Sequence, residues 1–150
     1  MKDRDKENCK EYNTLNWIRA SDYNEITSEG DEALLSAYVG GRIKHKGNTE
    51  IVKVSDYARV YVEGNVKKIY ASHSGYSYVL GNVDKIESLS RSVVYVIGDL
   101  KEAVVDRGYI YVTGNIENSQ ISRGGIIHEN FNIPDNILKF LQIQFPSLKK

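Results

Sequence analysis

The sequence lacks several features that would indicate a membrane, secreted or nucleic-acid-binding protein. It has one cysteine, Cys9, so no intramolecular disulfide can form and a reducing, cytoplasmic location is expected. No stretch approaches the roughly 18 apolar residues of a membrane span, and the charged opening MKDRDKENCKEY is unlike a signal peptide. With 20 basic and 20 acidic residues the formal net charge is zero, which argues against a generic nucleic-acid binder.

The residue patterns that build metal and catalytic sites are also missing. One cysteine and three scattered histidines fit no metal-ligand spacing. The chain has no Walker-type phosphate loop and no Gly-x-Ser-x-Gly. We therefore expect no metal, no cofactor and no enzymatic activity.

What the chain does contain is a repeat. The motif Tyr-Val-x-Gly occurs five times, with spacings of 23, 17, 17 and 16 residues. The copies begin at Tyr38, Tyr61, Tyr78, Tyr95 and Tyr111. A sixth, degraded copy begins at Gly124, where GGIIHE aligns with GYIYVT. Such self-similarity indicates a repeat architecture.

The period of 16–17 residues predicts an all-β fold, a short parallel β-helix or solenoid of about 5–6 coils. The period is too short for helical repeats of about 33–47 residues or propeller blades of about 40–45. Stacked coils place parallel strands about 4.8 Å apart. An antiparallel meander of hairpins is the main alternative, but it does not require all copies to share one register.

Residues two apart on a strand share a face, so the repeat predicts columns of stacked side chains. Three aliphatic columns should face the interior: Val60, Ser77, Val94 and Ile110; Val62, Val79, Val96 and Val112; Val66, Val83, Leu100 and Ile116. Three more columns should mark the bend that follows: Gly64, Gly81, Gly98 and Gly114; Asn65, Asn82, Asp99 and Asn115; Lys67, Asp84, Lys101 and Glu117. We expect the glycines to allow a tight bend, the amides to bond to one another and the alternating charges to hold the register.

The segments outside the repeat are interpreted as caps, because open solenoid ends expose unpaired backbone. The division is 1–32 as an N-terminal cap segment, 33–133 as the solenoid and 134–150 as a C-terminal helix over the last coil, all in one domain. Pro134 and Asp135 suit the first turn of that helix. The six extra residues of the first repeat are assigned to an outward loop within 44–57, near Gly47 and Asn48. His45 falls in this loop.

The glycine-turn-aliphatic style of YVEGNV and its copies resembles the small β-helices of the bactofilin type over residues 33–128. The resemblance implies a filament former that polymerises through uncapped coils. The predicted caps depart from that pattern. The period differs from the multiples of six typical of hexapeptide acyltransferases, and the clustered acidic residues of pectin-lyase-like enzymes are absent.

The side chains between the interior columns should form an outer sheet face that is unusually aromatic. The candidate partner-binding residues are Tyr61, Tyr76, Tyr78, Leu80, Tyr95, Ile97, Tyr109 and Tyr111. An exposed apolar face of this kind favours a protein partner, and a flat face is self-complementary about a two-fold axis, which makes a homodimer the simplest assembly. The alternatives are a passive ladder of stacked rings, or a face covered by the N-terminal segment.

Arginines form a further column at one end of successive coils. They are Arg91, Arg107 and Arg123. Like charges one coil apart repel unless they splay or bind an anion, so a phosphate or carboxylate contact is one interpretation and simple surface solubility the other. Asp106 should neutralise part of this charge.

Together these features predict a non-enzymatic protein-binding module that acts through the tyrosine face. One form is a phage or mobile-element inhibitor that occludes a host enzyme. The alternatives are a bactofilin-like structural filament protein and a carbohydrate-binding β-helix. Neither a membrane nor nucleic acid is expected as a partner.

Overall fold

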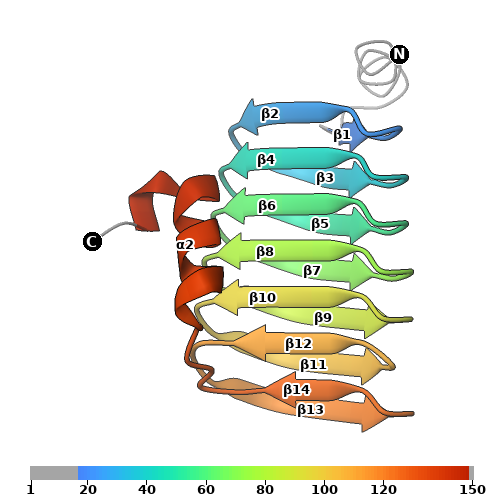
Figure 1. The fold of residues 1–150 in the computed structure, drawn as a ribbon, viewed down its shortest axis with the longest axis vertical. Helices are drawn as coiled ribbons and strands as arrows, with labels where there is room; N and C mark the ends of the chain where they lie inside the picture. The colour runs from blue at the N-terminus through green and yellow to red at the C-terminus, as the bar shows by residue number, and fades with distance from the viewer. Residues whose placement is uncertain (1–16, 149–150) are drawn as a thin grey trace.

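Residues 17–148, the part of the chain that the computed structural model describes, form a parallel β-solenoid with one helix beside it (Figure 1). Odd-numbered strands form one seven-stranded sheet and even-numbered strands another, here called the odd-strand and even-strand sheets. The odd strands are β1 Trp17–Ala20, β3 Glu32–Ala37, β5 Thr49–Val54, β7 Val66–Ala71, β9 Val83–Leu89, β11 Leu100–Asp106 and β13 Ile116–Ser122. The even strands are β2 Glu25–Glu29, β4 Arg42–Lys46, β6 Arg59–Glu63, β8 Tyr76–Leu80, β10 Val93–Ile97, β12 Tyr109–Val112 and β14 Ile126–His128.

The predicted fold class is confirmed, but the solenoid is longer than expected. Each coil contributes one strand to each sheet, which gives seven coils in place of the predicted 5–6. The additional coil comes from residues 17–32, which were assigned to the N-terminal cap and instead form β1 and β2. Cys9 and the rest of that predicted cap lie outside the described residues.

The sequence analysis aligned the first copy of the motif, at Tyr38, in the wrong register. Tyr38 does not align with Tyr61, whose partner in β4 is Lys44. Residues 44–57 do not loop outward, because β4 and β5 are ordinary strands joined through Gly47, which stacks on Gly64. The Tyr-Val-Gly-Gly at 38–41 lies at the opposite end of the coil, where Val39 and Gly40 turn the chain with positive φ. The sixth copy exists but is shifted by one residue, so that His128 aligns with Tyr111.

The interior columns are confirmed. All members of the first two predicted interior columns are at most 1% exposed, and of the third only Ile116, in the last coil, is partly open. Parallel register places like on like, as in Val62, Val79 and Val96. Burial of these stacked aliphatic side chains is the main stabilising contribution to the coils.

The bend columns fix the stacking distance and the register. A methyl group at Gly81 would overlap the carbonyl oxygen of Gly64 one coil below, so only glycine permits this approach. The Asn column works differently from the expectation: the Oδ1 of Asn65, Asn82 and Asp99 each accepts a backbone N–H one coil on, with 2.8 Å from the N of Asn82 to Asn65 and 2.9 Å from the N of Asp99 to Asn82. The side chains therefore supply acceptors to the bend backbone and do not bond amide to amide.

The charged column forms only part of the alternating pattern expected of it. Exposed pairs join Lys67 to Glu50 at 3.3 Å and Lys101 to Asp84 at 3.7 Å. Exposed pairs of this kind stabilise by well under about 1 kcal/mol.

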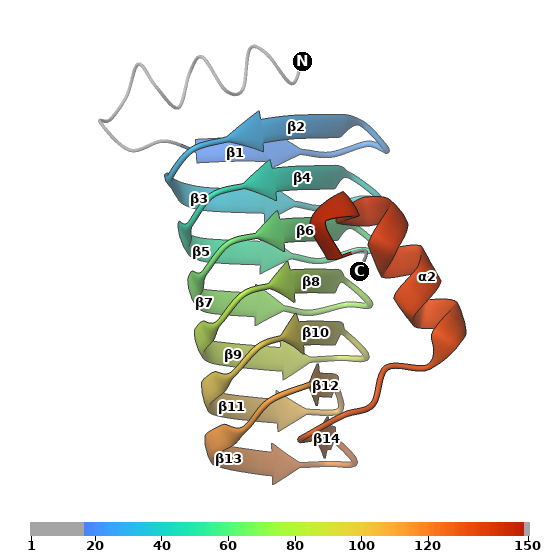
Figure 2. The same ribbon diagram turned by 90° about the vertical axis from the view of Figure 1, so that its left-hand side faces the viewer.

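The C-terminal helix does not cap the last coil. After β14 the chain reverses, with Asn130 at positive φ and the N–H of Phe131 donating to the carbonyl of Val112. Helix α2 (Asp135–Gln144) and the short 3-10 turn η1 (Pro146–Leu148) then run back beside the even-strand sheet (Figure 2). Pro134 and Asp135 do start the helix as predicted.

The coil of β13 and β14 is consequently open at its outer side. Among the described residues β13 pairs only with β11 and β14 only with β12. Ile121 is 56% exposed, although Val105, its partner one coil back, is 1% exposed. Figures 1 and 2 both show this end of the stack uncovered by α2.

We expect Gly81→Ala to destabilise the fold by roughly 2–4 kcal/mol, because its methyl group must displace backbone one coil away. Gly124→Ala is the matched control: its φ is also positive, at +78°, but nothing lies within 4 Å of the added methyl group. It should lose only about 1–2 kcal/mol of backbone strain. Denaturant unfolding measures both, and equal losses would mean that close stacking does not require the glycine.

Candidate functional site

The most distinctive surface is a row of stacked rings on the outer side of the even-strand sheet. Parallel register places Tyr61, Tyr78, Tyr95 and Tyr111, here called the tyrosine ladder, directly above one another. Successive ring centroids are 5.0, 5.6 and 4.8 Å apart, with interplanar angles of 9–20°. His128 continues the stack 5.1 Å below Tyr111. Face-to-face stacking leaves the ring edges, not the ring faces, for other contacts.

Helix α2 covers the N-terminal half of the tyrosine ladder. Phe140 lies 6.1 Å from the Tyr61 ring and 5.7 Å from the Tyr78 ring, and Phe145 lies 6.2 Å from Tyr61. Leu141 between them is fully buried. Further down, Phe131 packs on Tyr95 and Tyr111 at 6.1 and 4.9 Å. These contacts form a second hydrophobic cluster, separate from the solenoid interior.

The predicted partner-binding residues therefore divide into two groups, and the expectation that they are all exposed is wrong. Tyr61 and Tyr78 are 2% and 8% exposed, beneath the helix. The others are half-buried: Tyr76, Leu80, Tyr95, Ile97, Tyr109 and Tyr111. The sequence analysis named a covered tyrosine face as an alternative, but it assigned the cover to the N-terminal segment and not to the C-terminal helix. The apolar face of residues 137–145 indicated that this helix must bury something, without indicating where.

A groove remains between α2 and the lower part of the ladder. It has a volume of about 420 Å³. Its lining consists of Tyr76, Tyr78, Val93, Tyr95, Tyr109, Tyr111, Asn136, Ile137 and Phe140. The groove is thus lined mainly by aromatic rings, a composition typical of protein contact sites.

Burial sets the electrostatics of the ladder. Desolvation raises the pKa of the Tyr78 phenol well above its usual value, and it raises the pKa of Tyr95 and Tyr111 in the same direction. For Tyr61 the same desolvation raises the pKa, and a side-chain hydrogen bond from Arg59 opposes it. The Arg59 guanidinium also lies 5.5 Å from the centroid of the Tyr76 ring. The ladder is therefore neutral at physiological pH.

The predicted arginine column lies at the corners that join odd strands to even strands. Arg91, Arg107 and Arg123 have φ of 68°, 61° and 44° and line a shallow depression with Tyr109. Asp106 pairs with two of them, with Arg123 through two hydrogen bonds and with Arg107 at 3.6 Å. One carboxylate thus offsets part of three positive charges.

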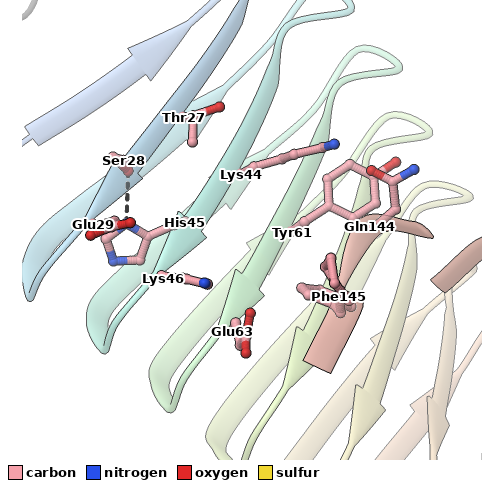
Figure 3. A pocket seen from close by; sticks show the side chains of 11 residues that line it. Thr27, Ser28, Glu29, Lys44, His45, Lys46, Tyr61, Glu63, Gln144 and Phe145 are labelled. Atoms are coloured by element: carbon pink, nitrogen blue, oxygen red, sulfur yellow. Dashed lines mark hydrogen bonds between the residues drawn. The ribbon is translucent and has the colours of Figure 1, made fainter. Parts of the chain in front are cut away.

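His45 was assigned to an outward loop from the sequence, and the structure places it in a strand. It takes the interior position equivalent to Val62 and is 3% exposed. Its Nδ1 lies 2.7 Å from the Ser28 hydroxyl (Figure 3), while Nε2 has no hydrogen-bond partner among the described residues. Desolvation lowers the pKa of His45, with a weaker opposing effect of the Asn48 and Gly30 backbone.

A smaller pocket of about 200 Å³ adjoins this region, where the end of α2 meets β2, β4 and β6 (Figure 3). Phe145 and Gln144 face Tyr61 and Lys44 across it. The Ser147 hydroxyl donates a 2.5 Å hydrogen bond to Glu63, which ties the end of the helix to the sheet.

Within residues 17–148 no three His, Cys, Asp or Glu side chains are grouped so that they could hold a metal ion. No helix in the same range is long and apolar enough to span a membrane. Comparison with known proteins finds no family model, no curated protein and no solved structure that matches the chain. The fold and its surfaces define the class: a parallel β-solenoid whose C-terminal helix packs on a stacked tyrosine column.

We expect Tyr78→Glu to release α2 from the sheet, because a buried carboxylate under Phe140 would cost several kcal/mol. The solenoid should persist, since its interior is untouched, while limited proteolysis should cut within residues 129–134. Tyr23→Glu is the control, because Tyr23 is 80% exposed at a corner. An unchanged cleavage pattern for Tyr78→Glu would show that the helix does not depend on the ladder.

We expect acid to destabilise the protein through His45. Its folded-state pKa is lowered, so the unfolded chain binds the proton more readily; this contribution to stability is complete above pH 6.5 and is lost as the pH falls below that value toward the folded pKa. Each unit of lowering corresponds to about 1.4 kcal/mol. His45→Val, which restores the column residue, should remove this loss when unfolding is measured at pH 8 and pH 5. His73→Gln, at an exposed histidine, is the control and should keep the loss of stability between pH 8 and pH 5. If His45→Val loses as much stability in acid as the wild-type chain, the loss belongs to other groups.

Proposed function

We propose that this protein is a non-enzymatic, self-associating scaffold whose primary contact is the open coil of β13 and β14. The observation that carries the proposal is the exposure of Ile121, which belongs to an interior column and yet is 56% exposed. The partner that fits is a second copy of the chain, meeting the first through the same coil.

The physical basis is the unpaired edge. Strands at the end of a sheet present free N–H and C=O groups that pair readily with another β-edge, and proteins normally protect them with charge, proline or a cover. Here β13 has the sequence IENSQIS, with neither lysine nor proline, and α2 lies elsewhere. The N-terminal coil differs, because Ile18 and Ala20 in β1 are each 1% exposed. Two C-terminal coils placed together would bury Ile121 and Ile126 from each copy.

A second candidate is binding of a different protein at the groove beside α2. The observation that favours it is the set of half-buried tyrosines there, which would receive an apolar side chain of a partner. This candidate retains the tyrosine-face hypothesis for residues 76–111, including an inhibitor that occludes another enzyme. The carbohydrate-binding alternative is weaker, because sugars stack on ring faces and the ladder rings already stack on one another.

Ile121→Lys should abolish coil-end association, because it places a charge on the surface that two copies would bury. Sedimentation or light scattering should show particles smaller than those of the wild-type chain. Ile143→Lys is the matched control: Ile143 is 68% exposed on the helix, away from the coil end, and its variant should keep the wild-type mass. Wild-type mass in Ile121→Lys would refute the coil-end contact.

A further inference from the structure

The corners that lead from odd strands to even strands carry a charge pattern along the stack that no feature of the fold requires. Every corner but one contains two consecutive residues with positive φ. The exception is the sixth corner, where only Arg107 has positive φ. In stacking order the corner residues are Asp22–Tyr23, Val39–Gly40, Asp56–Tyr57, His73–Ser74, Ser90–Arg91, Arg107 and Arg123–Gly124. The first three corners carry both carboxylates, and the last three carry all the arginines.

Several side chains at these corners are not those that the backbone favours. Positive φ suits Gly, Asn and Asp, and it strains the backbone of other residues. Tyr23 and Tyr57 nevertheless occupy such positions and are 80% and 72% exposed. Strain combined with an exposed aromatic ring points to a contact outside the chain.

The acidic and the basic corners carry charges of opposite sign. Asp22 and Asp56 form no ion pair with any described residue, which leaves two negative charges. The three arginines share only Asp106, which leaves two positive charges. Arg19, Arg42 and Lys53 lie on strands beside the acidic corners, as Asp106 lies on β11 beside the basic corners.

We propose that two copies of this chain associate side by side and antiparallel through these corners, about a two-fold axis at the fourth corner, His73–Ser74. The first corner of one copy then meets the seventh of the other, which brings Asp22 opposite Arg123. The third meets the fifth, which brings Asp56 and Tyr57 opposite Arg91. The coil spacing of about 4.8 Å is the same in both copies, so every corner finds its counterpart.

The chemistry of the two charged facing pairs is favourable. Asp22 faces Arg123 and Asp56 faces Arg91, and the two-fold axis makes each of these pairs occur twice. The Tyr57 ring offers its face to the Arg91 guanidinium, an attraction that strengthens when the pair loses water. A parallel arrangement would instead set arginine against arginine, so the charge pattern selects the antiparallel one. This contact is separate from the coil end and does not rest on the proposed function.

A charge-swap experiment tests the contact, performed in the Ile121→Lys chain so that coil-end association does not contribute. The starting chain should form particles of twice the 17.0 kDa chain mass. Asp22→Lys with Asp56→Lys, and separately Arg91→Glu with Arg123→Glu, should each weaken association roughly 100-fold or more, because like charges then face each other. An equimolar mixture of the two variants should regain the dimeric mass.

The control pair is Glu50→Lys with Asp84→Lys, an equal charge change at the opposite end of the coils, which should leave the dimer intact. A monomeric starting chain, dimers that persist in both reversed variants, or a mixture that stays monomeric would each overturn the proposal.

Cross-linking gives a measurement that does not depend on reversed charges. In a Cys9→Ser chain, Asp56→Cys with Ser90→Cys places thiols at the third and fifth corners, which face each other across the two-fold axis. Mild oxidation should yield a covalent dimer. Asp22→Cys with Ser90→Cys, at the first and fifth corners, should yield at least tenfold less, and equal yields would overturn the antiparallel register.

Discussion

The whole molecule depends on one constraint, the pairing of each residue with the residue seventeen positions further on. The glycine column enforces it sterically, because Gly64, Gly81 and Gly98 approach the carbonyl oxygen below more closely than a side chain would allow. The Asn column enforces it by hydrogen bonding, since each Oδ1 accepts one particular N–H of the next coil. A slip by one residue would break both sets of contacts and turn the valines outward.

The single departure from seventeen shows how this constraint is protected. The step is sixteen residues between β10 and β12, where Val93 pairs with Tyr109, and between β11 and β13, where Leu100 pairs with Ile116. The missing residue falls in the sixth corner, where Arg107 alone has positive φ. The strands on both sides keep their columns, because a corner can lose one residue without rotating a strand. Length variation is thus confined to the corners, which are also the places where surface chemistry varies most.

The sequence predicted the features that recur in every coil, and it failed on features that occur only once. The valine and glycine columns were readable because period and parity together determine which face a residue occupies. Tyr38 was misassigned because a four-residue motif recurred by coincidence at the other end of a coil. His45 was placed in a loop because a lone histidine is atypical of an aliphatic column. The helix was recognised from its apolar face, but amphipathicity specifies only that a face is buried. Its docking on the tyrosine ladder follows from the reversal at Asn130, which no periodic signal encodes.

Parallel stacking also explains why the interesting surfaces are columns. Identical side chains stacked at coil spacing stabilise when they are aliphatic or aromatic, as in the ladder, and repel when they are charged. The arginine corners therefore require opposite charge, and Asp106 supplies it only in part. Within one chain the corner carboxylates Asp22 and Asp56, at the first and third corners, are two or more coils away from the arginines. The proposed antiparallel partner would bring them within reach.

The two proposed contacts have a joint geometric consequence. Each relates two copies by a two-fold axis perpendicular to the solenoid axis, one at the fourth coil and one beyond the seventh. Two such rotations at different heights combine into a translation of twice their separation, about 34 Å at 4.8 Å per coil, together with a rotation of twice the angle between the two axes. A translation never closes on itself, so two contacts that each form a closed dimer would together form an open array. A filament would then require no uncapped N-terminal coil, and either contact alone would leave discrete dimers.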